Sequence, residues 1–168
     1  MKKFLLVVAL CALLGSFGMS QSQNKAGAAN PSAATIEEFS RTSKADGLTL
    51  KFVLLNDKTV DILFSGDSKN TMRAKAGEAT VFFVQGISEK DITLDSQFEV
   101  EQGGKTYPGE AVNVKNFQSG PLAKGTKISG LIQLSQKIDV AQPFKIKGAN
   151  NASAEFKLSR NAIKLLEN

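Results

Sequence analysis

The stretch "LTLKFVLL", residues 48–55, points to a β-strand because its apolar side chains recur at every second position. The residues that share one face are Leu48, Leu50, Phe52 and Leu54. A repeat of two is the period of a strand, whose successive side chains point to opposite faces. The stretch "TVDILFSG", residues 59–66, alternates in the same way. We therefore predict a second strand there, joined to the first by a tight hairpin link at residues 56–58.

Alternation of this kind continues toward the C-terminus. "ATVFFVQG", residues 79–86, is apolar on both faces, which favours a central strand. The later apolar pairs are Ile92 with Leu94, Phe98 with Val100, Val112 with Val114, Ile128 with Ile132, Phe144 with Ile146, and Ala154 with Phe156. Turn-forming residues separate them at intervals of roughly ten residues, as in an antiparallel β-sandwich or barrel. We predict an all-β domain of seven to nine strands over residues 46–168. Its tail, residues 159–168, forms either a last strand or a short helix capped by Ser159.

The first twenty residues have the layout of a secretory signal peptide. Lys2 and Lys3 precede an apolar run, residues 4–14, and a small-x-small cleavage site ends at Ser20. No later run is long enough to cross a membrane as a helix, which takes roughly 20 apolar residues. We expect an exported mature chain, periplasmic or extracellular, that has no transmembrane segment.

Residues 21–45 are expected to form a flexible leader before the domain. Small and polar residues dominate its first part, so it offers little apolar surface to offset the entropy of ordering. A short helix is allowed further on, with Thr35 as its N-cap and Gly47 as its stop.

Cys11 is the single cysteine of the chain and lies inside the signal segment. Its surroundings, "VVALCALL", resemble a bacterial lipobox, although that motif takes a small residue where this chain has Leu10. A surface lipoprotein anchored through Cys11 is therefore an alternative to simple export.

Removal of the signal would leave a chain without cysteine or histidine. Disulfides, thiolate chemistry, histidine-based triads and zinc sites with histidine or cysteine ligands are then excluded within this chain. We expect no cofactor. The loss of two lysines lowers the basic count from 21 to 19 against 16 acids, so the net charge falls from +5 to +3. No run of basic residues marks a nucleic-acid surface, and we expect no nucleic-acid partner.

Gly104, Lys105 and Thr106 form the closing triplet of a phosphate-binding loop. The full motif needs an earlier glycine where this chain has Glu99, and a helix after the threonine where it has Pro108. We interpret Gly103 and Gly104 as a hairpin turn between two strands.

Acidic residues are the remaining candidates for catalysis. Asp57 and Asp61, like Asp91 and Asp95, are four residues apart. On a strand this spacing separates them by roughly 13 Å, at about 3.3 Å per residue. We therefore expect solvated outer-face acids, and a carboxylate-dependent hydrolase would need acids brought together from separate strands.

Three lysines are candidates for a binding surface. Lys145, Lys147 and Lys157 alternate with apolar residues, so they would share a basic outer face if their strands pair. Such a face fits an anionic envelope polymer or an acidic envelope protein. Ordinary solvation of a half-exposed sheet accounts for the same pattern.

The stretch "DITLDSQFEVEQGGKTYPGE" (91–110), with "GPLAKGTKISGLIQL" (120–134), resembles the immunoglobulin-like β-sandwich domains of small secreted bacterial proteins of unknown function. The residues that carry the likeness are Phe98, Gly104, Lys105, Tyr107, Gly125 and Gly130. The resemblance covers about residues 90–135 and implies an antiparallel immunoglobulin-like β-sandwich and export. It carries over no active-site residue, and the chain lacks the tryptophan and the cysteine pair of antibody domains.

These observations lead to one expected function and two alternatives. The expected function is a non-enzymatic, exported binding or structural module of the bacterial cell envelope, with Lys145, Lys147 and Lys157 as its binding residues. The alternatives are a carboxylate-dependent hydrolase of envelope polysaccharide and a surface lipoprotein anchored through Cys11.

Overall fold

A computed structural model describes residues 31–167 of the chain. The expected signal segment, Cys11 and the first part of the leader lie outside these residues. The helices are α1 (Pro31–Glu38), α2 (Asp57–Leu63), α3 (Gly66–Glu78) and α4 (Arg160–Glu167). The strands are β1 (Ser40–Ala45), β2 (Leu48–Leu54), β3 (Val81–Ser88), β4 (Ile92–Leu94), β5 (Phe98–Gln102), β6 (Lys105–Lys115), β7 (Gly120–Leu122), β8 (Lys127–Leu134), β9 (Phe144–Gly148) and β10 (Ala152–Phe156).

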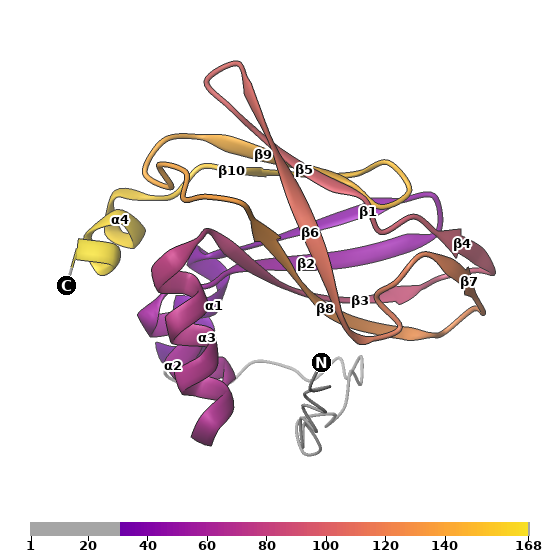
Figure 1. Cartoon of the computed structure of the whole chain (residues 1–168), viewed down its shortest axis with the longest axis horizontal. Coiled ribbons are helices and arrows are strands. Elements are labelled where there is room, and N and C mark those ends of the chain that lie inside the picture. The colour runs from indigo at the N-terminus through magenta and orange to yellow at the C-terminus, as the bar shows by residue number, and fades with distance from the viewer. Residues whose placement is uncertain (1–30, 168) are drawn as a thin grey trace, which may run out of the picture.

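Eight strands form one antiparallel sheet in the order β1-β2-β3-β8-β6-β5-β9-β10. The sheet curls until its two edge strands, β1 and β10, lie side by side, so it is nearly a closed barrel (Figure 1). Side chains bridge the remaining seam: the Ser153 N–H donates to Ser43 Oγ at 2.9 Å, and Arg41 donates to the Lys157 carbonyl at 2.9 Å. The all-β expectation is confirmed. The immunoglobulin-like sandwich is not, because the main sheet closes on itself and the second sheet is only the short pair β4-β7, whereas a sandwich has two facing sheets.

The inside of the barrel is a packed core. Phe144 and Phe156 stack with ring centroids 4.9 Å apart, and Phe82 lies 5.6 Å from Phe156. A second aromatic group joins Phe98 to Phe117 at 5.3 Å. Small barrels are filled by inward side chains in this way, which leaves the surface and the ends of the barrel for binding sites.

The stretch 59–66 is not a strand, which corrects the sequence-based prediction. Residues 57–63 form α2, and Asn56 caps it: Asn56 Oδ1 accepts from the Thr59 N–H at 3.1 Å, and Thr59 Oγ1 accepts from the Asn56 N–H at 2.9 Å. Val60, Leu63 and Phe64 also follow the i, i+3, i+4 spacing of a helix, and all three pack against the outside of the barrel. The apolar pattern suited both structures, and the capping box accounts for the helix.

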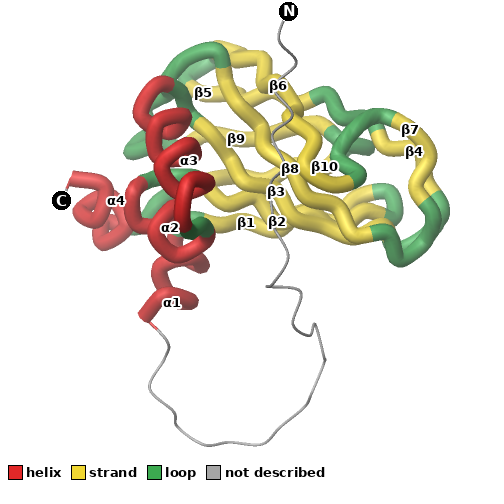
Figure 2. The backbone as a smooth tube through the Cα atoms, turned by 60° about the horizontal axis from the view of Figure 1, so that its bottom comes forward, coloured by secondary structure: helices red, strands yellow, loops and turns green. Residues whose placement is uncertain are grey.

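The sequence analysis does not predict helix α3. Its sequence is polar almost all round, and only Met72 and Ala76 pack against the outer cluster. That cluster lies on the outer faces of β2, β3 and β8 and is centred on Val53, Leu55, Val60, Val81, Phe83 and Leu131. Figure 2 shows α1, α2 and α3 gathered beside the barrel.

The two ends of the described chain refine the predicted boundaries. Strand β1 falls within the expected leader, yet it pairs with β2 from Ser40↔Val53 to Ala45↔Leu48. Helix α1 precedes it and contains Thr35, the expected cap. At the C-terminus the helical alternative is confirmed as α4: Ser159 Oγ accepts from the Ala162 N–H at 3.0 Å, and Ala162 is fully buried against the core.

Candidate binding site at the barrel mouth

The β5–β6 hairpin extends beyond the barrel wall. Gly103 and Gly104 both have positive φ, 57° and 77°, and Gln102 pairs with Lys105 across them, so the predicted two-residue turn is confirmed. Residues 105–108 pair with β5 alone, because pairing with β8 begins only at Gly109↔Leu134. The tip of the hairpin therefore stands free at one end of the barrel (Figure 1).

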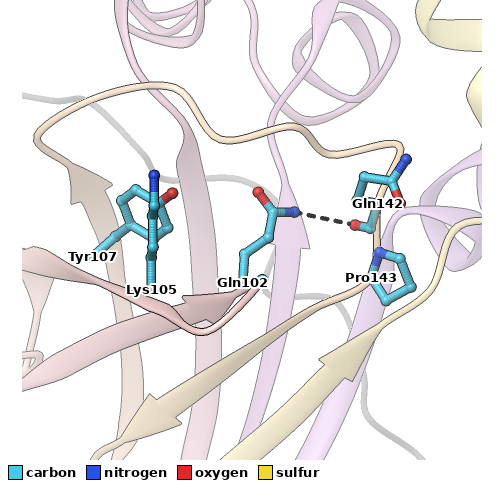
Figure 3. A pocket seen from close by; sticks show the side chains of 6 residues that line it. Gln102, Lys105, Tyr107, Gln142 and Pro143 are labelled. Atoms are coloured by element: carbon cyan, nitrogen blue, oxygen red, sulfur yellow. Dashed lines mark hydrogen bonds between the residues drawn. The ribbon is translucent and has the colours of Figure 1, made fainter.

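A pocket of about 440 Å³ lies between this hairpin and the connection from β8 to β9. We call it the barrel mouth; its lining residues are Gln102, Gly103, Lys105, Tyr107, Gln142 and Pro143. Gln102 holds the two walls together (Figure 3): its Nε2 donates to the carbonyls of Asp139 at 2.7 Å and Gln142 at 3.3 Å. Its Oε1 accepts from the Asp139 N–H at 3.2 Å. The pocket is thus built from two cross-linked segments.

The lining combines one cation and one aromatic ring with two glutamines, a glycine and a proline. Lys105 is exposed and forms no ion pair within residues 31–167, and no carboxylate lines the pocket. Tyr107 lies two residues along the same strand; it is half-buried and packs against the core. Their polar tips point the same way in Figure 3, with Pro143 on the opposite wall. An ammonium group beside a partly exposed ring suits an anion that carries an apolar face.

A second depression, of about 490 Å³, lies near the C-terminal end of α3. It is lined by Glu78, Ala79, Pro108, Gly109, Glu110, Gln133, Leu134 and Ser135. Lys75 donates to Gln133 Oε1 at 3.2 Å at its edge. Two glutamates, Glu78 and Glu110, thus share one depression. In the described part of the chain, no group of three or more acidic, histidine or cysteine residues is placed to hold a metal ion.

The three candidate lysines lie on the outside of the barrel but do not form a uniformly basic face. The pairing of β9 puts Lys145 between Glu101 and Glu155 of its neighbouring strands. Lys147 lies opposite Glu99 and makes an ion pair with Glu101. Lys157 follows Glu155 just beyond β10. Carboxylates therefore alternate with the lysines, which the sequence could not reveal without the strand order.

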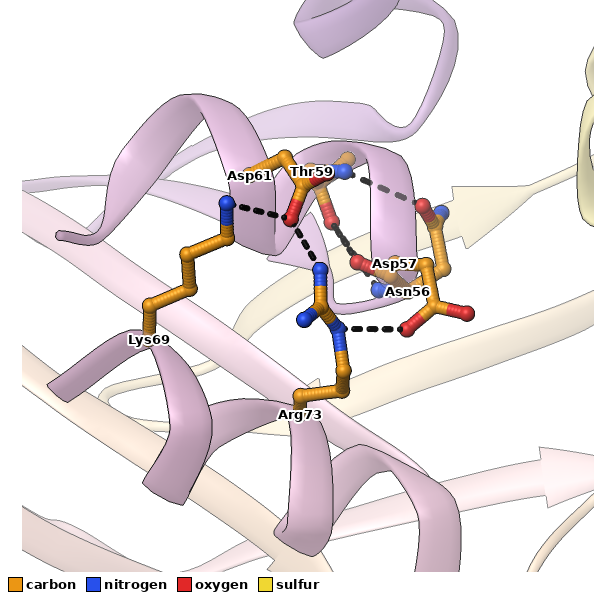
Figure 4. Close-up of polar contacts among 6 residues, drawn as sticks. All are labelled: Asn56, Asp57, Thr59, Asp61, Lys69 and Arg73. Atoms are coloured by element: carbon orange, nitrogen blue, oxygen red, sulfur yellow. Dashed lines mark hydrogen bonds and ion pairs between the residues drawn. The ribbon is translucent and has the colours of Figure 1, made fainter. Parts of the chain in front are cut away.

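The acids that the sequence analysis paired are structural. Asp57 and Asp61 lie one turn apart on α2, not on a strand as predicted, and both bind Arg73 of α3 (Figure 4). Arg73 Nε is 3.2 Å from Asp57, and Lys69 Nζ is 3.1 Å from Asp61. The hydrogen bond from Lys69, aided by the charge of Arg73, lowers the pKa of the Asp61 carboxyl from its usual value.

Asp91 and Asp95 are also engaged locally. Asp91 Oδ1 accepts from the Lys124 N–H at 2.7 Å, and Asp95 Oδ1 accepts from the Gln97 N–H at 3.1 Å. Both carboxylates therefore fix loops at the end of the barrel opposite the mouth.

Sequence reasoning missed the barrel mouth as a site. The sequence analysis considers Lys105 as part of a phosphate-binding triplet, and Lys105 and Tyr107 as carriers of the immunoglobulin-like resemblance, but not as a binding pair. The available signal was that Lys105 lies two residues from Tyr107, the chain's single tyrosine, so that both side chains would share one face of a strand. Gln142 and Pro143 gave none, because their position depends on a connection that Gln102 ties down.

No protein-family model, curated protein or solved structure matches the chain. None of the helices between residues 31 and 167 is long and apolar enough to cross a membrane.

Proposed function

We propose that this chain is a non-enzymatic, exported module of the bacterial cell envelope that binds an anionic envelope polymer at the barrel mouth. One observation carries the proposal: Lys105 is an exposed cation without an ion pair within residues 31–167, in a pocket that no carboxylate lines. Tyr107 beside it supplies a flat, partly exposed ring.

The arrangement supports binding for two physical reasons. A ligand anion would meet one uncompensated positive charge, whereas the lysines on β9 are interleaved with glutamates. The pocket walls are also tied together by Gln102, so less ordering entropy is lost when a ligand binds. A packed barrel interior leaves the mouth as the natural place for a ligand.

Binding is tested by affinity electrophoresis through gels that contain polygalacturonate, polyglutamate or polyphosphate. We expect at least one polymer to retard the mature protein, and Lys105→Gln to reduce the retardation several-fold. Lys115→Gln is the matched control, because Lys115 lies exposed at the other end of the same strand. Equal retardation of the two variants, or none of the wild-type protein, would rule out the barrel mouth as the site.

Export rests on the sequence of residues 1–20, and we propose a periplasmic or extracellular location. Intact-mass measurement on the protein from its own host tests this. A chain that begins near Gln21 supports export of the soluble module, while a diacylglyceryl mass on Cys11 would establish the lipoprotein alternative.

We also propose that the chain is related to the immunoglobulin-like domains that residues 90–135 resemble. In this relationship its sheet would have curled into a barrel where those domains form a sandwich.

A carboxylate-dependent hydrolase is the second candidate, favoured by Glu78 and Glu110 in one depression. The pair would act as acid and base on an envelope polysaccharide. Release of new reducing ends that is abolished in both Glu78→Gln and Glu110→Gln would support it. Activity that either variant retains would exclude this pair.

A further inference from the structure

We infer that the barrel mouth selects a carboxylated sugar, as in a uronic-acid polysaccharide, over other anions. This inference rests on the proposed function and deepens it. It follows from the shape of the Tyr107 ring surface, from the backbone edge beside it, and from the number of charges in the pocket.

Tyr107 supplies an aromatic ring to the lining. The residue is half-buried: it packs against the barrel core and also lines the pocket, so part of it stays exposed. Pro143 provides a second apolar surface in the lining. A sugar ring presents C–H groups on one face and hydroxyls at its rim, which matches a flat aromatic wall with polar groups beside it.

The neighbouring backbone is poorly suited to a peptide. Across a two-residue turn Gln102 and Lys105 form a hydrogen-bonded pair, so Thr106 and Pro108 direct their backbone groups away from β5. Proline has no N–H to give. An added peptide strand would therefore meet a free edge that lacks a donor at Pro108, which disfavours binding by strand addition.

The charge of the pocket matches a carboxylate. Lys105 is the single charged residue among the lining residues. One ammonium balances one carboxylate, whereas phosphate carries about 1.5 to 2 negative charges and is usually held by several donors or cations. The side chain of Gln142 makes no hydrogen bond to any described residue, so its amide is available to donate to and accept from ring hydroxyls.

The test uses the chain's own tyrosine. Tyr107 is the only tyrosine and the chain has no tryptophan, so the intrinsic fluorescence of the mature protein reports on this site alone. The probes are tetragalacturonate and tetramannuronate, with neutral maltotetraose, tetraglutamate and inorganic phosphate as comparisons. We expect a saturable fluorescence change with a uronide and none with the other three. Lys105→Gln should weaken uronide binding about tenfold or more, as expected for loss of a charged hydrogen bond, and Lys115→Gln should not.

The other outcomes separate the two proposals. A response to tetraglutamate or phosphate that equals or exceeds the uronide response overturns sugar selection and leaves an anion site at the mouth. A response to maltotetraose that equals the uronide response removes the role of the carboxylate. No response to any of the five probes overturns the inference together with the proposed function.

Discussion

At the scale of the residue, single side chains decide how closely the barrel packs. Gly130 on β8 faces inward, and the Phe117 ring lies where a β-carbon would stand. Gly77, near the end of α3, has open space around its α-carbon. Replacing glycine by alanine should therefore change the free energy of unfolding in opposite directions at these two positions.

We expect Gly130→Ala to destabilise the fold by about 1 to 3 kcal/mol, because Phe117 would have to move within a packed core. Gly77→Ala should instead stabilise it by up to about 1 kcal/mol, since alanine favours the helix. Urea denaturation of both variants measures the two free energies of unfolding. A neutral Gly130→Ala would show that Phe117 does not pack as described.

The Asp61 carboxyl makes stability depend on pH. Its folded-state pKa is lowered, so it adds stability above its usual value of 3.8, and that contribution is lost as the pH falls through the lowered pKa. Asp61→Asn should therefore show a smaller fall in Tm than wild type between about pH 5 and about pH 2. Glu167→Gln, at the C-terminal end, should follow the wild-type curve. If Tm falls equally for Asp61→Asn and wild type over this acidic range, this role of Asp61 is contradicted.

At the scale of the element, charge holds α3 in place. The helix has little apolar surface, and its links to α2 are the ion pairs of Arg73 and Lys69 with Asp57 and Asp61. Exposed pairs are individually weak and are screened by salt. The α2–α3 hairpin should thus open more readily than the barrel.

Hydrogen exchange tests this order of stability. In Arg73→Gln we expect faster amide exchange in residues 57–78 and unchanged exchange in β3 and β8, and added salt should reproduce the effect in wild type. Arg160→Gln, on α4, removes an arginine elsewhere and should leave α3 unaffected. If amide exchange in Arg73→Gln became equally faster in the barrel strands and in the helices, the barrel and the α2–α3 hairpin would instead unfold as one cooperative unit.

The elements also show what the sequence can predict. Strands β2 and β8 were predictable because a half-buried strand forces a period of two, and β3 because a run that is apolar on both faces favours a central strand. Helix α2 was not, because Val60 and Phe64 fit both periods: Ile62 completes the strand pattern and Leu63 completes the helical one. Helix α3 was not, because its position depends on Arg73 meeting acids of another element. The turn at Gly103 and Gly104 was predictable from local chemistry, whereas the pocket beside it needs two distant segments.

At the scale of the whole molecule, closure of the sheet joins strands far apart in the chain. Strand β6 lies beside β8, and β5 beside β9, so pairing order does not follow sequence order. Alternation predicts which strands form but not which strands become neighbours. This is why a sandwich was predicted and why the acids between the β9 lysines were missed.

The stability of the seam between β1 and β10 should depend on the hydroxyl of Ser43. Ser43→Ala removes the acceptor of the Ser153 N–H, so we expect faster exchange of that amide and a loss of about 1 kcal/mol in the free energy of unfolding. Thr42→Ala, on the exposed face of β1, is the control. Unchanged exchange at Ser153 would show that the seam is held in another way.

The central claim is that the barrel mouth, and not the lysines of the outer face, meets the ligand. Its most direct test is a backbone-amide NMR titration of the mature chain with tetragalacturonate. We predict that the largest shift changes fall between Gln102 and Tyr107 and at Gln142. Changes centred on Lys145, Lys147 and Lys157, or none at saturating uronide, would contradict the account.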